Sequence, residues 1–263
     1  MWNLLRTCYF WTVVVVLTVV LFALVLVCQC FVMGGLLPRD GSPIHWIASL
    51  WGRSLMACMP GWQVVVEGRE HLPKRGQPVV MVANHESMTD IWAMYYLGVQ
   101  FRWLSKDSIF RIPIIGTTMK WCGYVPVNRK SRESGTEAMR QSALRLAMGI
   151  PMFFFPEGTR SVDGSIKSFK LGAFKLAQTA GVPVLPIVIH GAGNLFAKGS
   201  MVPGRGAKIH IKVLELQGVP TKEGDLGSYA EEVRERLITA HRELVKKDGL
   251  AEAKGEMSKL ALT

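Results

Sequence analysis

The feature that most constrains this chain is an uncharged run from Tyr9 to Met33. A run of about 25 apolar residues is long enough to span a bilayer as a helix. A cleaved signal peptide is the alternative, but the run is too long for one and no Ala-x-Ala-like site follows it. Arg6 and Arg39 flank the run and give no orientation bias. The sequence therefore predicts an N-terminal membrane-embedded helical segment.

A break rich in glycine and proline at residues 34–43 separates this run from a second helical pattern at residues 44–59. Trp46, Trp51 and Arg53 in that pattern suit a helix at the level of the lipid headgroups. An ordinary core helix fits the same residues. Residues 1–59 are therefore expected to anchor the chain, either as a hairpin in one leaflet or as a span followed by an interfacial helix.

The remaining chain alternates strand-like with helix-like segments, which indicates an α/β fold with a largely parallel mixed sheet flanked by helices. Strands are expected at 63–67, 78–83, 101–105, 124–128, 152–155, 184–190 and 209–216, and helices at 90–97, 134–148, 170–180 and 229–246. Residues 60–247 would form this domain. Residues 248–263 are polar and are expected to fray as a C-terminal tail.

Composition limits the partners. The chain has 263 residues and a net charge of +11, so anionic partners such as phospholipid headgroups are expected. Its basic residues are dispersed and accompany a membrane segment, which argues against nucleic acid. The five cysteines show no metal-type pairing, and their odd number argues against a disulfide framework.

One candidate catalytic pair follows the expected strand at 78–83. His85 falls in the loop after that strand and Asp90 in the first turn of the next helix, where the two side chains can meet. A carboxylate on one imidazole nitrogen leaves the other nitrogen as a base. The spacing of Ser87 and Asp90 also matches a helix N-cap with its reciprocating carboxylate, so Asp90 could be a capping residue and His85 an ordinary polar one.

Two further loops after expected strands carry cations. Lys106 ends the strand at 101–105, and Arg160 closes the segment 155–160, Phe-Pro-Glu-Gly-Thr-Arg. Loops beyond the carboxyl ends of strands share one rim of an open α/β sheet, so these groups could converge with His85. Arg160 beside Gly158 suits a bidentate grip on phosphate, although a plain surface turn would also explain the segment.

Taken together, these motifs resemble the glycerolipid acyltransferase family. Four blocks occur in order between residues 62 and 190, and Pro126 stands where the family more usually has an aromatic or aliphatic residue. The blocks are Asn84-His85 with Asp90, Gly123 with Pro126-Val127-Asn128-Arg129, Phe155 to Arg160, and Val184-Leu185-Pro186-Ile187-Val188-Ile189.

The resemblance implies a role for each matching residue. His85 would be the general base and Asp90 its orienting partner. The acceptor phosphate would be bound by the residues Arg160, Lys106, Arg129, Gly158, Glu157 and Thr159. An apolar tunnel for the acyl chain could end near Ile114, Ile115, Met119 and Trp121.

The resemblance also implies a reaction. An acyl group would pass from acyl-CoA or acyl-carrier protein to the 2-hydroxyl of lysophosphatidic acid, giving phosphatidic acid without a metal or a cofactor. The active site would face the cytoplasm, on a bacterial inner membrane. Glycerol 3-phosphate or another lysophospholipid could be the acceptor instead. A non-catalytic lipid-binding protein is a further alternative, whereas a serine hydrolase would need a Gly-x-Ser-x-Gly elbow that the sequence lacks.

Overall fold

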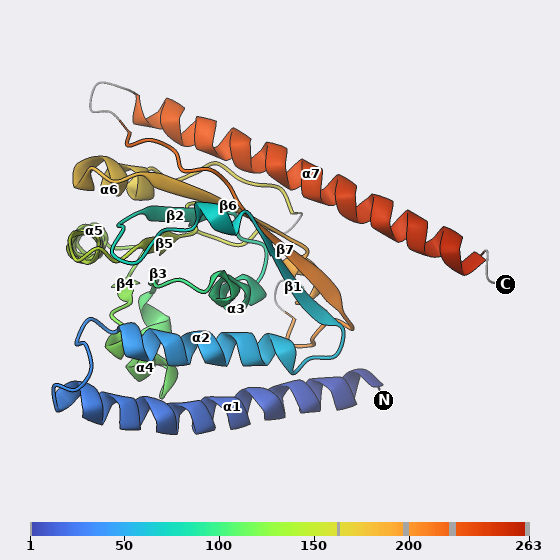
Figure 1. The fold of residues 1–263 in the computed structure, drawn as a ribbon, viewed down its shortest axis with the longest axis horizontal. Helices are drawn as coiled ribbons and strands as arrows, with labels where there is room; N and C mark the ends of the chain where they lie inside the picture. Colours follow the sequence, from blue (N-terminus) through green and yellow to red (C-terminus); the bar gives the residue numbers. More distant parts are fainter. Residues whose placement is uncertain (1, 162–163, 197–199, 221–224, 261–263) are drawn as a thin grey trace.

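The computed structural model describes residues 2–161, 164–196, 200–220 and 225–260. They form a seven-stranded sheet with helices on both faces (Figure 1). The strand order is β1-β7-β6-β2-β5-β3-β4. The strands are β1 (Trp62–Glu67), β2 (Val80–Ala83), β3 (Arg102–Lys106), β4 (Val125–Val127), β5 (Met152–Phe154), β6 (Val184–His190) and β7 (Ala207–Val213).

The sheet is largely parallel, which confirms the predicted fold class. β2 lies at its centre, with Val80 opposite Val184 of β6 on one side and Met152 of β5 on the other, both parallel. The exception is β7, which runs antiparallel to β6 and parallel to β1. The carboxyl ends of β2, β3 and β5 therefore share one rim, and the loops that leave them can meet there.

Strand residues alternate between two hydrophobic cores, as the two-residue period of a strand requires. In β2, Met81 and Ala83 face one core, and Val80 and Val82 face the other. The first core is covered by α1 (Trp2–Met33), α2 (Ser42–Ala57), α3 (Thr89–Met94) and α4 (Ile115–Trp121). The second is covered by α5 (Arg132–Ala147), α6 (Gly172–Ala180) and α7 (Leu226–Leu260).

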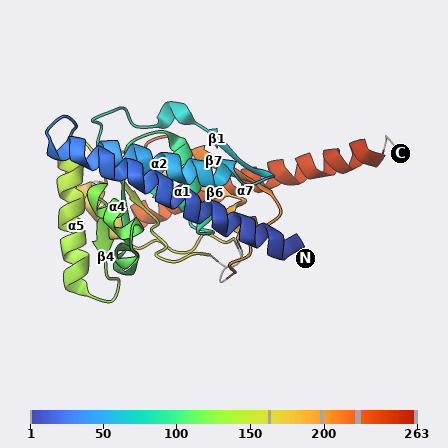
Figure 2. The same cartoon turned by 90° about the horizontal axis from the view of Figure 1, so that it is seen from below.

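α1 and α2 lie side by side and antiparallel along one margin of the molecule (Figures 1 and 2). α1 has a mean hydropathy of 3.0 in its most apolar window and is mostly exposed, so its length and composition suffice to cross a membrane. α2 buries Ile44, Leu55 and Met56 in the first core while Trp46 stays half exposed. The second helix thus combines core packing with one outward tryptophan.

His45 of α2 is a buried polar residue within this core. Its Nδ1 accepts from the Tyr124 hydroxyl at 2.9 Å, and its Nε2 faces the Val99 carbonyl at 3.3 Å. Burial lowers the pKa of His45 to about 3, helped by the positive charge of Arg102. The imidazole is therefore neutral in the folded protein at physiological pH.

Two of the differences from the sequence-based prediction concern the C-terminal range and the start of the helix after His85. α7 continues past Asp248 to Leu260, so helix occupies most of the range that was expected as a C-terminal tail; residues 261–263 lie outside the described part. The helix after His85 begins at Thr89, and the Ser87 hydroxyl donates to the Phe196 carbonyl at 3.2 Å. The Ser87 hydroxyl also accepts from the Thr89 amide at 3.5 Å, so Ser87 anchors the loop to a neighbouring segment and caps the helix only through this long contact.

Candidate active site

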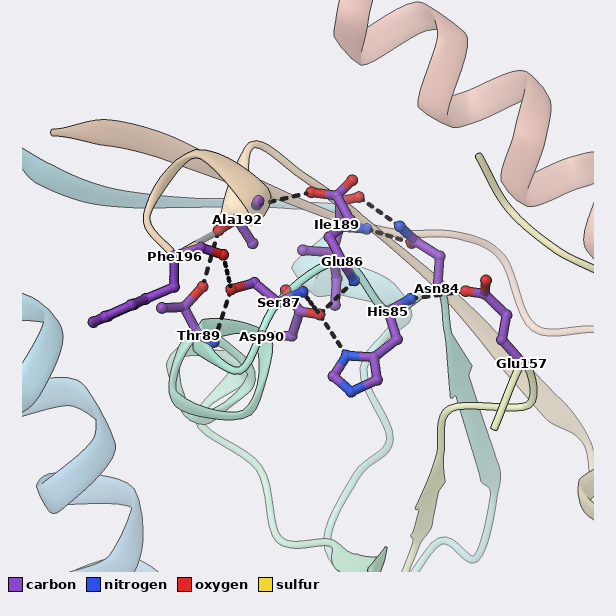
Figure 3. A network of polar contacts seen from close by, with 11 residues as sticks. Asn84, His85, Glu86, Ser87, Thr89, Asp90, Glu157, Ile189, Ala192 and Phe196 are labelled. Atoms are coloured by element: carbon purple, nitrogen blue, oxygen red, sulfur yellow. Dashed lines mark hydrogen bonds and ion pairs between the residues drawn. The ribbon is translucent and has the colours of Figure 1, made fainter. Parts of the chain in front are cut away.

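The loop between β2 and α3 brings His85 and Asp90 into contact (Figure 3). His85 Nδ1 lies 2.6 Å from Asp90 Oδ2. The Asp90 side chain is fully buried and that of His85 is 14% exposed. A buried carboxylate on Nδ1 fixes the proton there and leaves Nε2 unprotonated, as a base requires. In the described part of the chain, Nε2 makes no hydrogen bond.

Asp90 also holds the backbone of its own loop. Its Oδ2 accepts from the Glu86 amide at 2.7 Å and from the Ser87 amide at 2.9 Å (Figure 3). Burial raises the pKa of Asp90, and the hydrogen bonds from His85 and Ser87 act in the opposite direction. The contacts that each interpretation of Asp90 requires are therefore both present, because one oxygen binds the imidazole and also accepts from the backbone amides before the helix.

Asn84 fastens the same loop to the sheet. Its side-chain amide donates to the Ile189 carbonyl and accepts from the Ile189 amide, each at 2.8 Å. Thr89 adds a hydrogen bond from its hydroxyl to the Ala192 carbonyl at 3.1 Å. These bonds join β2 to the end of β6, so the position of His85 is fixed by two strands rather than one.

The segment at 155–160 packs directly against His85. The Phe155 ring stacks on the imidazole with centroids 4.0 Å apart and planes at 13°. The amide of Ser161, next to Arg160, donates to the His85 carbonyl at 2.8 Å. The structure thus brings together the two motifs that the sequence predicted to converge, and Phe155 adds a contact that no spacing rule indicated.

Glu157 connects the two segments through backbone groups. It is buried, and its two carboxylate oxygens accept from the His85 amide at 2.9 Å and the Lys167 amide at 3.1 Å. Burial raises the pKa of Glu157, while these two bonds act to lower it. The resemblance implied that Glu157 belongs to a phosphate-binding loop. In the structure its carboxylate holds backbone amides on either side of that loop.

The cations around the loop are less constrained. Within the described ranges, the Arg160 guanidinium makes no hydrogen bond or ion pair, and Lys106 is exposed at the end of β3. Arg129 donates to the Gly158 carbonyl, and Thr159 is exposed. Arg160 and Lys106 are therefore free to meet an anion, which is the role that the resemblance implied for them, whereas Arg129 is engaged by the loop itself.

Lys170 was missed by the sequence analysis. Gly158 has φ +72°, and a Cβ there would lie 2.9 Å from Lys170 Nζ, so this ammonium stands directly beside the loop. Arg129, Gly158 and Lys170 also line a cleft of about 490 Å³ that reaches Phe155. Lys170 lies outside every motif found in the sequence. It reaches Gly158 only because the chain turns after Phe155.

The predicted acyl tunnel corresponds in part to a small apolar cavity of about 70 Å³ between α1, α2 and α4. Ile114, Ile115 and Met119 line it, whereas Trp121 is outside the lining and stacks on Phe22 at 6.4 Å. Ile114 has φ 67°, and the Ile115 amide donates to the Pro113 carbonyl at 2.7 Å, which makes a γ-turn. The cavity has room for only a short apolar segment.

Comparison with known families adds an independent line of evidence. Residues 63–190 match the model of the family described as Acyltransferase. This range contains all four sequence blocks and the residues that hold His85, apart from the carbonyl groups of Ala192 and Phe196. The match and the geometry therefore refer to the same part of the chain.

Curated relatives bear a consistent name. The chain is 41% identical over 181 residues to a 1-acyl-sn-glycerol-3-phosphate acyltransferase of Chlamydomonas reinhardtii, covering 69% of this chain and 54% of that protein. A chloroplastic enzyme of that name from Arabidopsis thaliana is 42% identical over 156 residues, covering 59% of this chain and 43% of that protein. The chain thus spans about half the length of these relatives.

A solved structure resembles nearly the whole chain. The crystal structure of the 1-acyl-sn-glycerophosphate acyltransferase PlsC from Thermotoga maritima superposes with a TM-score of 0.75 at 28% identity. The likeness covers 92% of this chain and 95% of that one. The N-terminal helices, the sheet and the C-terminal region therefore share one architecture with that enzyme.

Proposed function

This chain belongs to the acyltransferase family through residues 63–190, and we propose that it makes phosphatidic acid by acylating the 2-hydroxyl of lysophosphatidic acid. The observation that carries the proposal is the His85–Asp90 pair, 2.6 Å apart, whose second imidazole nitrogen makes no hydrogen bond in the described part of the chain. Relatives that bear the name of this activity support it.

The proposed reaction begins at the free nitrogen of His85. Nε2 takes the proton of the acceptor hydroxyl as its oxygen bonds to the thioester carbonyl carbon. The tetrahedral intermediate then collapses, the carbon–sulfur bond breaks, and the departing thiolate takes the proton from His85. Asp90 stabilises the imidazolium that forms in between. A positioned base of this kind contributes ~10²–10⁴-fold in rate. The thioester is already activated, so the reaction requires no metal or cofactor.

The cations select the acceptor. Arg160, Lys106 and Arg129 would bind the phosphate of lysophosphatidic acid, while Glu157 keeps the loop of Arg160 against His85. A guanidinium without a protein partner can give both of its parallel N–H groups to a phosphate. Gly158 and Thr159 leave the approach open, because one has no side chain and the other faces solvent.

The acyl groups would enter from the membrane. The apolar helix α1 indicates membrane association, and the cavity lined by Ile114, Ile115 and Met119 lies between it and α4. We place residues 1–59 as the anchoring part and the active site on the cytoplasmic face, of an inner membrane if the source is bacterial. Acyl-CoA or acyl-carrier protein would be the donor.

An acceptor panel tests the proposal. Purified protein in detergent receives labelled acyl-CoA with lysophosphatidic acid, glycerol 3-phosphate, lysophosphatidylcholine or monoacylglycerol. We expect transfer to lysophosphatidic acid at a rate at least tenfold above the others. Preferred use of glycerol 3-phosphate would change the substrate class, and acylation of none of the four would overturn the enzymatic assignment.

A further inference from the structure

A second group of titratable side chains lies behind the catalytic loop, where α7 crosses the end of β6. Glu86, His190 and His241 each present one ligand atom, and these atoms lie within 4.8 Å of one another. The Glu86 carboxylate points away from the His85 ring (Figure 3), and the proposed acyl transfer uses none of these three side chains. We propose that they bind one divalent transition-metal ion of the zinc class.

The spacing of the ligand atoms fits a small ion. Glu86 Oε1 and His241 Nε2 are 3.2 Å apart. Zinc bonds of ~2.0–2.1 Å in a tetrahedral site put neighbouring ligand atoms roughly 3.3 Å apart, so this pair already has the required separation. The rings of His190 and His241 have centroids 5.0 Å apart and planes at 85°, so a small rotation of His190 lets the two converge on one point.

The donor types select the metal. Two imidazole nitrogens and one carboxylate are typical of zinc and its neighbours among the transition metals, whereas calcium and magnesium prefer oxygen ligands throughout. The three side chains are 8–21% exposed, so they are partly removed from competing water yet reachable by an ion. A site of this kind keeps a fourth position for water.

The surroundings supply an independent observation. His210 is 2% exposed; its Nε2 lies 2.9 Å from Asp248 Oδ1, and its Nδ1 has no hydrogen-bond partner among the described residues. His210 faces His190 across the β6–β7 pair, and Asp248 Oδ2 lies 3.5 Å from His190 Nε2. Ligating histidines commonly turn their other nitrogen to a carboxylate, which here would be Asp248.

Such an ion would fasten α7 to the catalytic loop. Glu86 and His241 are 155 positions apart in the chain, so the ion would cross-link distant segments of the fold. The Glu86 amide donates to Asp90 Oδ2, so holding the Glu86 side chain also steadies the carboxylate that orients His85. The expected result is a more stable domain with a better fixed base.

Zinc binding by the full chain, purified without a polyhistidine tag and stripped with a chelator, tests this inference. Calorimetric titration with Zn²⁺ should show one ion per chain and a melting temperature that rises on binding. His241→Ala and Glu86→Gln should each weaken binding at least tenfold. His71→Ala, at a histidine outside the cluster, should bind as the native chain does. His85→Ala should do so too, which excludes the catalytic histidine as the ligand.

Cobalt gives a second readout that does not depend on the stability of any variant. Co²⁺ in the native chain should show the strong visible bands of a four- or five-coordinate site, and added Zn²⁺ should remove them. The inference is overturned if the native chain shows no saturable binding, if both cluster variants bind as tightly as the native chain, or if His85→Ala abolishes binding. Binding is measured without substrate, so its failure would leave the proposed acyl transfer untouched.

Discussion

The two loops that meet at the active site are built in opposite ways. The loop carrying His85 and Asp90 is buried, and its polar side chains are tied to β6 and to each other. The segment carrying Arg160 is partly exposed, and its guanidinium has no hydrogen-bond partner in the described ranges. Both loops follow central strands of one sheet, so topology does not explain the difference.

The difference fits the role that we propose for each loop. A base has to stand in one position before the substrate arrives, so its tautomer and orientation are fixed by groups that the fold itself satisfies. A cation that receives a phosphate has to remain unpaired until then, because a protein partner would compete with the ligand. Glu157 connects the two loops: it belongs to the Arg160 segment, and its carboxylate accepts from the backbone amide of His85.

Removing the base should have the largest effect. We expect His85→Ala to lose about 10³-fold or more in turnover, because an alcohol is too weakly acidic to attack unaided. Folding and membrane association should be retained. His71→Ala serves as the matched control and should keep full activity. If the His85→Ala protein were still active, His85 would not be the general base.

Changing the orienting carboxylate should have the next largest effect. Asp90→Asn keeps an oxygen for the backbone amides but removes the charge that stabilises the imidazolium, so turnover should fall on the order of 10²-fold. Melting temperature and turnover are measured on the same sample, with Asp225→Asn, at an exposed aspartate before α7, as the control. If Asp90 were only a capping residue, the variant would be less stable and would still turn over at nearly the native rate.

The unpaired cation should respond differently. Arg160→Lys keeps the charge and loses the planar pair of donors, so the apparent affinity for lysophosphatidic acid should fall roughly tenfold to a hundredfold. Affinity for the thioester donor should change little. Arg111→Lys, at an exposed arginine that pairs with Asp107, is the control. Equal weakening of both substrates would mean that Arg160 supports the fold instead.

Changing Glu157, which joins the two loops, should lower both turnover and acceptor affinity, each by less than the changes at His85, Asp90 and Arg160. Glu157→Gln leaves one carbonyl oxygen for two amides, so one buried N–H loses its acceptor and the protein should lose about 1–3 kcal/mol of stability. Acceptor affinity and turnover should then fall together. Glu137→Gln, on the exposed face of α5, is the comparison. A variant with lower affinity alone would show that the carboxylate acts on the substrate and not through the backbone.

Acid conditions should lower the free energy of unfolding, because the buried His45 is neutral in the folded protein. His45 has a pKa of about 3 when folded and near 6.5 when unfolded, so the unfolded chain binds an extra proton as the pH falls below 6.5. Its contribution to stability is thus complete above pH 6.5 and should decline by about 2 kcal/mol by pH 5. Unfolding at both pH values, in the native chain and His45→Gln, measures this; an equal decline in both would locate the sensitivity elsewhere.

Much of this arrangement could be predicted from sequence because its signals are local. The strand before His85 and the turn before Asp90 are each visible within a few residues, and both were correct. Strand order was not predictable, since the pairing of β1 with β7 depends on distant segments. The same holds for the bond from the His85 amide to Glu157 and for Lys170 beside Gly158, which arise only after the loops meet.

The pairing of β1 with β7 also sets an order of events during synthesis. Trp62 can pair with Ala207 only after about 145 further residues have been synthesised, which at ~5–20 residues per second takes roughly 7–30 seconds. α1 emerges from the ribosome well before that, with its apolar surface exposed. The nascent chain can therefore reach the bilayer while the edge strand of its sheet is still unpaired, and membrane targeting precedes closure of the sheet.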